Sequence, residues 1–261
     1  MIGLLKRLFH RPSIDLDIAS LSERGLVRPD NQDCLLVNRE RLAFCVADGM
    51  GGGEGGAAAS RIVCRFIAKA VVVRGDFAER LKHLDESFRD ANSAVRDFAR
   101  RAGYRQMAST ATALIVDEVD ARQAVIGYVG DTRVYRWRCG RLQQLTYDHT
   151  LAGEVRRAHL SKTVASDFHD RAHVFAHVLT RAIGVADEVC PEWRRVNMRP
   201  GDKYLVCSDG VHDMLSFADI ESVLARPSRA RETVSELASK IVAAGAADNY
   251  SMIVVGIGGS R

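Results

Sequence analysis

The chain has 261 residues, of which 47% are hydrophobic, so it can bury a packed core as an ordinary globular protein. Its formal net charge is +4, but Lys6, Arg7 and Arg11 supply three of those charges within the first dozen residues. Only +1 is left for the rest of the chain, which excludes the basic surface typical of a nucleic-acid-binding protein.

The opening stretch, MIGLLKRLF, is too short to span a membrane and lacks the apolar core and cleavage site of a signal peptide. We expect residues 1–13 to be a flexible N-terminal extension, with a weak membrane-surface or partner contact as the alternative. Stable membrane insertion is not expected.

Two strands and two helices are expected in the first part of the chain. Residues 33–38 and 42–48 are apolar and suit consecutive strands of a buried sheet. A helix is predicted over residues 54–73. A longer amphipathic helix is predicted over residues 81–98, because its apolar residues recur three or four positions apart and form one stripe.

Three strand-like runs follow, at residues 109–119, 124–138 and 142–146. Residues 147–176 are polar, contain several histidines and show weak periodicity, which predicts a mobile or partly helical flap.

The last part of the chain again suggests strands, helices and a final strand. Residues 192–198 and 203–209 flank the turn RPGD and are predicted to form a hairpin. Helices are expected over residues 217–225 and 230–247, and a last strand is expected over residues 251–258.

This order of elements does not alternate strictly between strand and helix. Strands cluster at both ends and in the centre of the chain, with helices in pairs between them, which favours an α+β fold of mainly antiparallel sheets covered by helix pairs. No internal repeat or linker is visible, so residues 14–261 are predicted to form a single domain with a flap at about 147–176.

The cysteines lack C-x-x-C spacing and mostly lie in apolar segments; they are Cys34, Cys45, Cys64, Cys139, Cys190 and Cys207. This usage predicts reduced core thiols in a cytoplasmic protein, without a disulfide framework or zinc site. None is followed at the sixth position by arginine, as in thiolate phosphatases, so a cysteine nucleophile is not expected.

Four aspartates share one context, at the border of an apolar strand-like segment and beside a small residue: Asp48, Asp131, Asp209 and Asp248. Any one of them alone would be read as a turn residue. Four together indicate converging carboxylates that need a counter-charge, and such oxygen ligands suit Mg²⁺ or Mn²⁺ better than zinc.

A dinucleotide-binding loop is the competing interpretation of the glycine run. Gly51, Gly53 and Gly56 match G-x-G-x-x-G before a helix, with Asp76 about 20 residues further on. That interpretation leaves the later aspartates unexplained and requires alternating strand–helix units that the chain lacks. A P-loop is excluded because no Lys-Ser or Lys-Thr pair closes the run.

Seven motifs occur in one order along the chain: RPDNQD, DGMGG, GDTR, LTYDHT, LTRAIG, CSDG and ADNYS. With them the sequence resembles the metal-dependent type 2C (PPM-type) serine/threonine protein phosphatases, above all the compact stand-alone bacterial members, from about residue 18 to 257. The resemblance implies a central sandwich of two antiparallel sheets flanked by pairs of antiparallel helices, in four layers.

The same resemblance implies a catalytic centre with two Mn²⁺ or Mg²⁺ ions. Asp48 would bridge the two ions, Gly49 would bind one of them through its carbonyl oxygen, and Asp209 and Asp248 would complete the other. Asp131, together with Asp209, would hold a third and weaker ion.

The resemblance also assigns residues around the ions. Gln32 and Asp33 would hold metal-bound waters, Arg28 would bind the substrate phosphate, and Asn249 would support the ligands from behind.

The sequence departs from the family pattern at several positions beside the predicted ligands. Met50 stands where animal members carry a histidine proposed as general acid, and Gly53 and Ala57 stand where bacterial members usually carry a histidine and, further on, a glutamate. Gln32 replaces the commoner glutamate, and MAST replaces MGTT. The predicted metal ligands are intact, so activity is expected, and a water on the third ion at Asp131 is a hypothetical source of the leaving-group proton.

The implied reaction is hydrolysis of phosphoserine or phosphothreonine in proteins by a water shared between two metal ions. The alternative is a catalytically weak or silent domain of the same fold that binds phosphoproteins or senses metal. The expected partners are phosphorylated proteins, including a serine/threonine kinase and its substrates, and the chain is expected to be a cytoplasmic monomer. A role in type VI secretion rests on analogy only.

Overall fold

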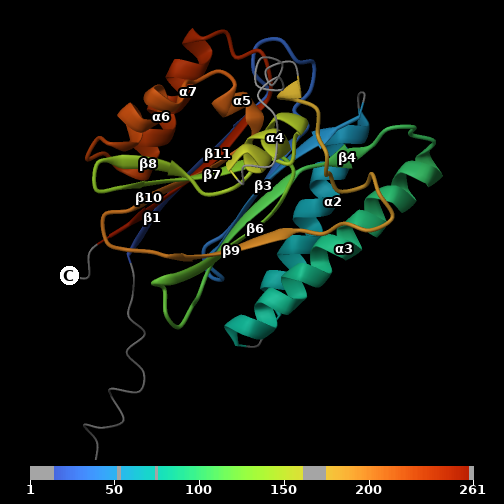
Figure 1. The fold of residues 1–261 in the computed structure, drawn as a ribbon, viewed down its shortest axis with the longest axis horizontal. Coiled ribbons are helices and arrows are strands. Elements are labelled where there is room, and N and C mark those ends of the chain that lie inside the picture. The colour runs from blue at the N-terminus through green and yellow to red at the C-terminus, as the bar shows by residue number, and fades with distance from the viewer. Residues whose placement is uncertain (1–14, 52–53, 74–75, 161–174, 259–261) are drawn as a thin grey trace, which may run out of the picture.

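A computed structural model describes residues 15–51, 54–73, 76–160 and 175–258. Two antiparallel sheets stack face to face in its centre (Figure 1). The first sheet contains, in spatial order, β1 (Leu16–Glu23), β11 (Tyr250–Ile257), β10 (Lys203–Cys207), β7 (Arg133–Arg138) and β8 (Arg141–Gln144). The second sheet contains β2 (Asp33–Asn38), β3 (Ala43–Met50), β5 (Ala111–Val116), β6 (Gln123–Val129) and β9 (Glu192–Asn197), and the short β4 (Ala108–Ser109) pairs with β3.

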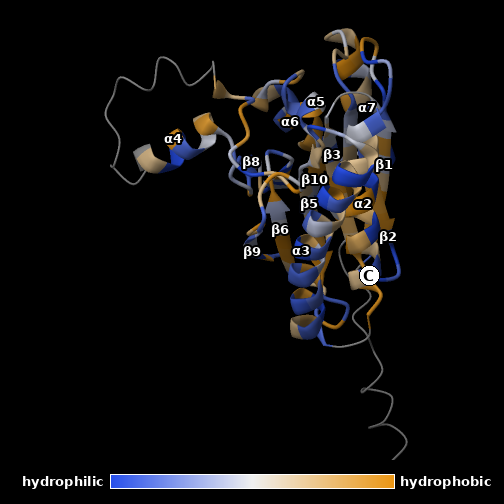
Figure 2. Cartoon of the chain, turned by 90° about the vertical axis from the view of Figure 1, so that its right-hand side faces the viewer, coloured by the Kyte–Doolittle hydropathy of each residue, from blue (hydrophilic) through white to orange (hydrophobic). Residues whose placement is uncertain are grey.

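Helices cover the outer faces of both sheets. The second sheet carries α2 (Glu54–Val71) and α3 (Phe77–Ala102), and the first carries α6 (Phe217–Leu224) and α7 (Ala230–Ala243). The short α5 (Asp209–His212) follows β10, and α4 (Leu151–Leu160) stands apart from these layers in Figure 2. The predicted α+β fold, with two antiparallel sheets and flanking helices, is confirmed.

The alternation of side chains along the central strands produces three separate hydrophobic cores. On β3, Ala43, Cys45 and Ala47 pack beneath α2 and α3, whereas Phe44 and Val46 point into the space between the sheets. Strand β11 alternates in the same way between the inter-sheet core and the core beneath α6 and α7. Because both faces are buried, these strands are continuous apolar runs in the sequence.

The long helix confirms the apolar stripe predicted over residues 81–98 except at its last position, where Phe98 is 40% exposed, and the helix extends beyond both ends. Leu84, Phe88 and Val95 are fully buried against the second sheet, while the outer face of α3 is largely hydrophilic (Figure 2). The helix begins at a capping box between Asp76 and Glu79, and it ends at a glycine with a left-handed φ of 75°. Asp76, considered above for a dinucleotide site, is therefore a helix cap.

One predicted strand, residues 124–138, is wrong because the chain leaves it halfway. It divides into β6 and β7, which belong to different sheets. Gly130, with φ of 102°, makes the break, and a Cβ there would lie 2.5 Å from the Thr110 side chain. This crossing places Asp131 at the seam between the sheets.

The hairpin predicted for residues 192–198 and 203–209 is also wrong. Strand β9 pairs with β6, whereas β10 pairs with β7 and β11, so the intervening turn carries the chain from one sheet to the other. Buried Asp202 fixes that turn by accepting hydrogen bonds from Arg138 Nε at 2.7 Å and the Arg199 backbone N at 2.8 Å.

Smaller differences have local causes. Strand β1 and helix α5 were not predicted, and β10 ends at Cys207. Helix α7 ends at Ala243 instead of 247, because Gly245 and Ala246 adopt positive φ of 105° and 39°.

The prediction of core thiols is wrong for Cys139 and Cys190, which are exposed. Cys45, Cys64 and Cys207 are buried, as predicted. Exposure of Cys139 follows from its place in the turn between β7 and β8, where it has a φ of 49°.

Some predicted features fall outside the described residues. They are the N-terminal extension (1–13), Gly53 of the glycine run, and residues 161–174 of the flap. Of the predicted flap, residues 151–160 form α4, and Asp148, His149 and Thr150 just before them are buried. Among the helices that the structure describes, none combines the length and apolarity needed to cross a membrane.

Candidate metal centre

The four aspartates predicted to converge line one cleft at an end of the sandwich. Asp48 lies near the end of β3 in the second sheet, and Asp131 lies in the crossing between β6 and β7. Asp209 begins α5 directly after β10, and Asp248 lies just before β11. The cleft has a volume of about 350 Å³ and also contains the predicted residues Arg28, Gln32, Gly49 and Asn249.

Asp33 lies behind the cleft instead of lining it. It stands opposite Asp48 in the β2–β3 register, and its Oδ2 accepts a hydrogen bond from Ser208 Oγ at 2.8 Å. Burial raises its pKa to about 7, against the hydrogen bonds from Ser208 and Ser251. Its Oδ1 is buried and has no hydrogen-bond partner within the described residues, so it can accept from a water at the cleft floor.

Burial and mutual repulsion dominate the electrostatics of the cleft. Burial raises the pKa of Asp48 well above its ordinary value, and the charges of Asp209, Asp33 and Asp131 raise it further. The pKa of Asp131 is raised to about 6, first by burial and then by Asp209. Crowded carboxylates in a poorly solvated site require a cation, and an all-oxygen donor set fits Mg²⁺ or Mn²⁺.

The carboxylates line the cleft walls without closing a cage. Within the described parts of the chain, no three His, Cys, Asp or Glu side chains are close enough to form a ready-made ligand set. An open arrangement suits hard cations such as Mg²⁺, which usually keep several waters and use few protein ligands.

The glycine after Asp48 permits a close crossing of the backbone. Gly49 N donates to Gln32 O at 3.2 Å, and a Cβ on Gly49 would lie 2.0 Å from Gly56 O. On the other side, Asp48 O accepts from Thr110 N at 2.8 Å. The end of β3 is therefore held between neighbouring segments and the start of α2, which fixes the position of Asp48.

Arg28 lies at the mouth of the cleft, where its side chain is 55% exposed. Its Nη2 donates to Asp248 Oδ2 at 2.6 Å, and this hydrogen bond and charge raise the pKa of the guanidinium. A planar guanidinium at the rim of an acidic cleft can bind the oxygens of an incoming phosphate.

Asn249, which follows Asp248 just before β11, joins this segment to the Arg28 loop. Its Oδ1 accepts from Gln32 N at 2.8 Å, and its Nδ2 donates to the carbonyl oxygens of Arg24 and Asp30 at 2.7 and 2.8 Å. These three bonds give Asn249 a supporting position.

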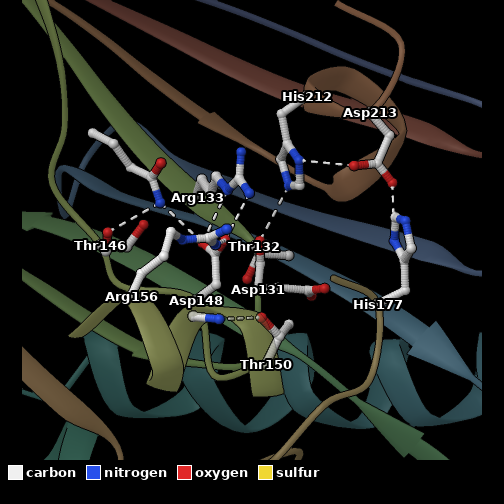
Figure 3. A network of polar contacts seen from close by, with 12 residues as sticks. Asp131, Thr132, Arg133, Thr146, Asp148, Thr150, Arg156, His177, His212 and Asp213 are labelled. Atoms are coloured by element: carbon white, nitrogen blue, oxygen red, sulfur yellow. Dashed lines mark hydrogen bonds and ion pairs between the residues drawn. The ribbon is translucent and has the colours of Figure 1, made fainter. Parts of the chain in front are cut away.

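His177 also lines the cleft, and the sequence interpretation missed it. It contacts Asp213, which in turn contacts His212 (Figure 3). The only available signal was the position of His177 two residues before the LTRAIG motif, whereas His212 and Asp213 follow Asp209 by three and four residues.

A two-sheet sandwich with an acidic, cation-requiring cleft and an arginine at its mouth is typical of a metal-dependent hydrolase acting on phosphate esters. The chain belongs to the protein phosphatase 2C family, whose sequence profile matches residues 20–244. It is a serine/threonine protein phosphatase, and its activity is the metal-dependent dephosphorylation of proteins.

Three relatives illustrate the similarity. "Protein phosphatase PhpP" of Streptococcus pneumoniae is 27% identical over 245 residues, which are 92% of this chain and 97% of the relative. The structure of "PppA, a key regulatory component of T6SS in Pseudomonas aeruginosa" is 29% identical with a TM-score of 0.81, covering 94% of this chain and 99% of that one. The PstP catalytic domain "in complex with 2 Manganese ions" is 30% identical with a TM-score of 0.78, at the same coverage.

Proposed function

We propose that the acidic cleft is the dephosphorylation centre, with two core Mn²⁺ or Mg²⁺ ions held by Asp48, the Gly49 carbonyl, Asp209 and Asp248. The observation that carries this is the crowding of the Asp48, Asp131, Asp209 and Asp248 carboxylates, together with Asp30, in one cleft of about 350 Å³. When bound, the cations supply an activated water and neutralise charge on the phosphoryl group. The two manganese ions in the PstP structure support the number of core ions.

The surrounding residues act on substrate and water in this proposal. Arg28 binds and orients the phosphate. Gln32 accepts a hydrogen bond from water in the cleft, as does Asp33 Oδ1, which has no partner among the described residues. Asn249 positions Asp248, and Asp131 holds a weaker third ion together with Asp209.

The proposed substrates are proteins phosphorylated by a serine/threonine kinase, and we place the protein in the cytoplasm as a monomer. The relatives named "Protein phosphatase PhpP" and "Serine/threonine protein phosphatase PstP" support this substrate class.

Removal of metal tests this centre directly. Hydrolysis of a phosphothreonine peptide is expected to stop in excess chelator and to return when Mn²⁺ is added, because the clustered carboxylates need a cation before water can be activated. Phosphate release and calorimetric Mn²⁺ titration are measured on the same preparation. Full turnover in chelator would refute the cation centre, and Mn²⁺ binding without turnover would favour the silent phosphoprotein-binding domain.

Substitution of Arg28 tests phosphate binding. Arg28→Ala is expected to raise KM more than it lowers kcat, because the guanidinium engages phosphate before the reaction begins. Arg24→Ala is the matched control, since Arg24 donates to the Pro29 carbonyl in the same loop. Loss confined to kcat would instead assign Arg28 to the transition state.

A further inference from the structure

Dephosphorylation of serine or threonine has a requirement that the proposed cation ligands do not meet. The departing alkoxide is a poor leaving group, so a proton must reach it as the P–O bond breaks. Met50 lines the cleft, but its thioether carries no proton to donate. The proton must therefore come from another cleft residue or from a water in the cleft.

His177 is the one histidine among the described residues that line the cleft. Backbone contacts hold its segment at the rim: Thr180 N donates to His149 O at 2.8 Å, and Leu151 N donates to Val178 O at 2.9 Å. A β-bridge between Thr150 and Leu179 adds to these contacts. Because the neighbouring backbone is fixed, the imidazole has a defined place at the cleft.

Asp213 orients the imidazole ring. Its Oδ2 lies 3.4 Å from His177 Nδ1, and its Oδ1 lies 3.3 Å from His212 Nδ1 (Figure 3). His212 is buried, and its Nε2 lies within hydrogen-bond distance of the Asp131 carbonyl oxygen, at 3.2 Å. The carboxylate thus lies between two imidazoles, each within ion-pair distance.

This contact leaves the other ring nitrogen of His177 available for substrate. In the described part of the chain, no hydrogen-bond partner lies at His177 Nε2, and the side chain is 68% exposed. An imidazole that lines a reaction cleft and has a carboxylate beside its Nδ1 is a common arrangement for proton transfer.

We propose that His177, oriented by Asp213, is the general acid that protonates the departing serine or threonine oxygen. As water forms its bond to phosphorus, the ester P–O bond breaks and its electron pair stays on the alcohol oxygen. That oxygen takes the proton from Nε2 and leaves as the alcohol. The attacking water gives up one proton to solvent, and the neutral imidazole regains one from solvent. The inference rests on the proposed cation centre, which it extends to the leaving group.

The test compares two substrates that differ in their need for a proton. His177→Gln keeps a polar side chain but removes the acid. Its kcat on a phosphothreonine peptide is expected to fall by about 10²-fold or more, the usual contribution of a general acid. On p-nitrophenyl phosphate, whose leaving group departs without a proton, kcat is expected to stay within a few-fold of wild type.

Matched variants complete the experiment. Asp213→Asn is expected to show the same substrate pattern with a smaller loss, because it misorients the ring without removing it. His83→Gln, on the outside of α3 and paired with Glu86, is expected to behave as wild type. Mn²⁺ affinity of His177→Gln, measured by calorimetry, is expected to be unchanged.

Several results would overturn the proposal. Equal losses on the two substrates, or a rise in KM alone on the peptide, would make His177 a structural or docking residue. A selective peptide loss in Asp131→Ala but not in His177→Gln would assign the proton to the third-ion site. Chelator-resistant turnover of the wild type would refute the cation centre itself, a failure separate from that of His177.

Discussion

Asp48→Asn is expected to lose turnover and Mn²⁺ binding together. Asp48 is the one carboxylate proposed to contact both core ions, and it lies among Asp33, Asp131 and Asp209, whose charges act on it. Charge stabilisation by a metal centre amounts to several kcal/mol, which corresponds to a rate loss of about 10³-fold. Phosphate release from a phosphothreonine peptide and calorimetric Mn²⁺ titration measure the two losses.

Stability separates loss of the centre from misfolding in this variant. In the absence of metal, Asp48→Asn is expected to melt at or above the wild-type temperature, because a neutral amide relieves repulsion among buried carboxylates. The rise in melting temperature that Mn²⁺ gives the wild type is expected to disappear. Asp30→Asn, which removes a carboxylate from the same cleft, is the control and should retain turnover. Near-normal turnover of Asp48→Asn would place the centre elsewhere.

Gly49→Ala is expected to destabilise the fold by about 2–3 kcal/mol, at the upper end of ordinary overpacking effects. The added Cβ would lie 2.0 Å from Gly56 O and 2.7 Å from Gln32 O. Both are backbone atoms, so α2 or the loop before β2 must move, and Asp48 moves with them. Mn²⁺ affinity is therefore expected to fall as well.

Gly256→Ala provides a matched control in another strand. A Cβ there would meet Asp17 at 3.6 Å, an ordinary contact, so no loss of stability is expected. Urea unfolding followed by circular dichroism compares the two variants. If Gly49→Ala is as stable as Gly256→Ala, the close crossing beside Asp48 can adapt and does not constrain the centre.

The elements that could be predicted are those whose own residues determine them. Apolar strands buried on both faces, such as β3, are continuous hydrophobic runs, and α3 has a clear stripe with caps at its ends. Convergence of the four aspartates was predictable because each lies where an apolar strand meets a turn. Asp33 could also have been placed behind the cleft, since its register opposite Asp48 follows from the predicted β2–β3 pair.

The wrong predictions concern which strands and segments pair with each other, because the local sequence does not specify pairing across the fold. The turn between β9 and β10 has ordinary hairpin chemistry, yet each strand finds its neighbour in a different sheet. Similarly, the apolar pattern runs through β6 and β7, and only Gly130 signals the break. His177 was missed because its position depends on backbone pairing with residues near His149, about thirty positions earlier.

The cleft residues come from both sheets, so cation binding and the packing of the two sheets are expected to be coupled. Asp48 lies near the end of a strand of the second sheet, and Asp209 and Asp248 border strands of the first. Asp131 lies in a crossing between the sheets. On the proposed assignment, each bound cation acts as a reversible cross-link that sets the spacing of the sheets at this end. If cation binding stabilises the inter-sheet packing around Phe44, the packing stabilises cation binding by the same free energy. A substitution that loosens this packing is therefore expected to lower cation affinity.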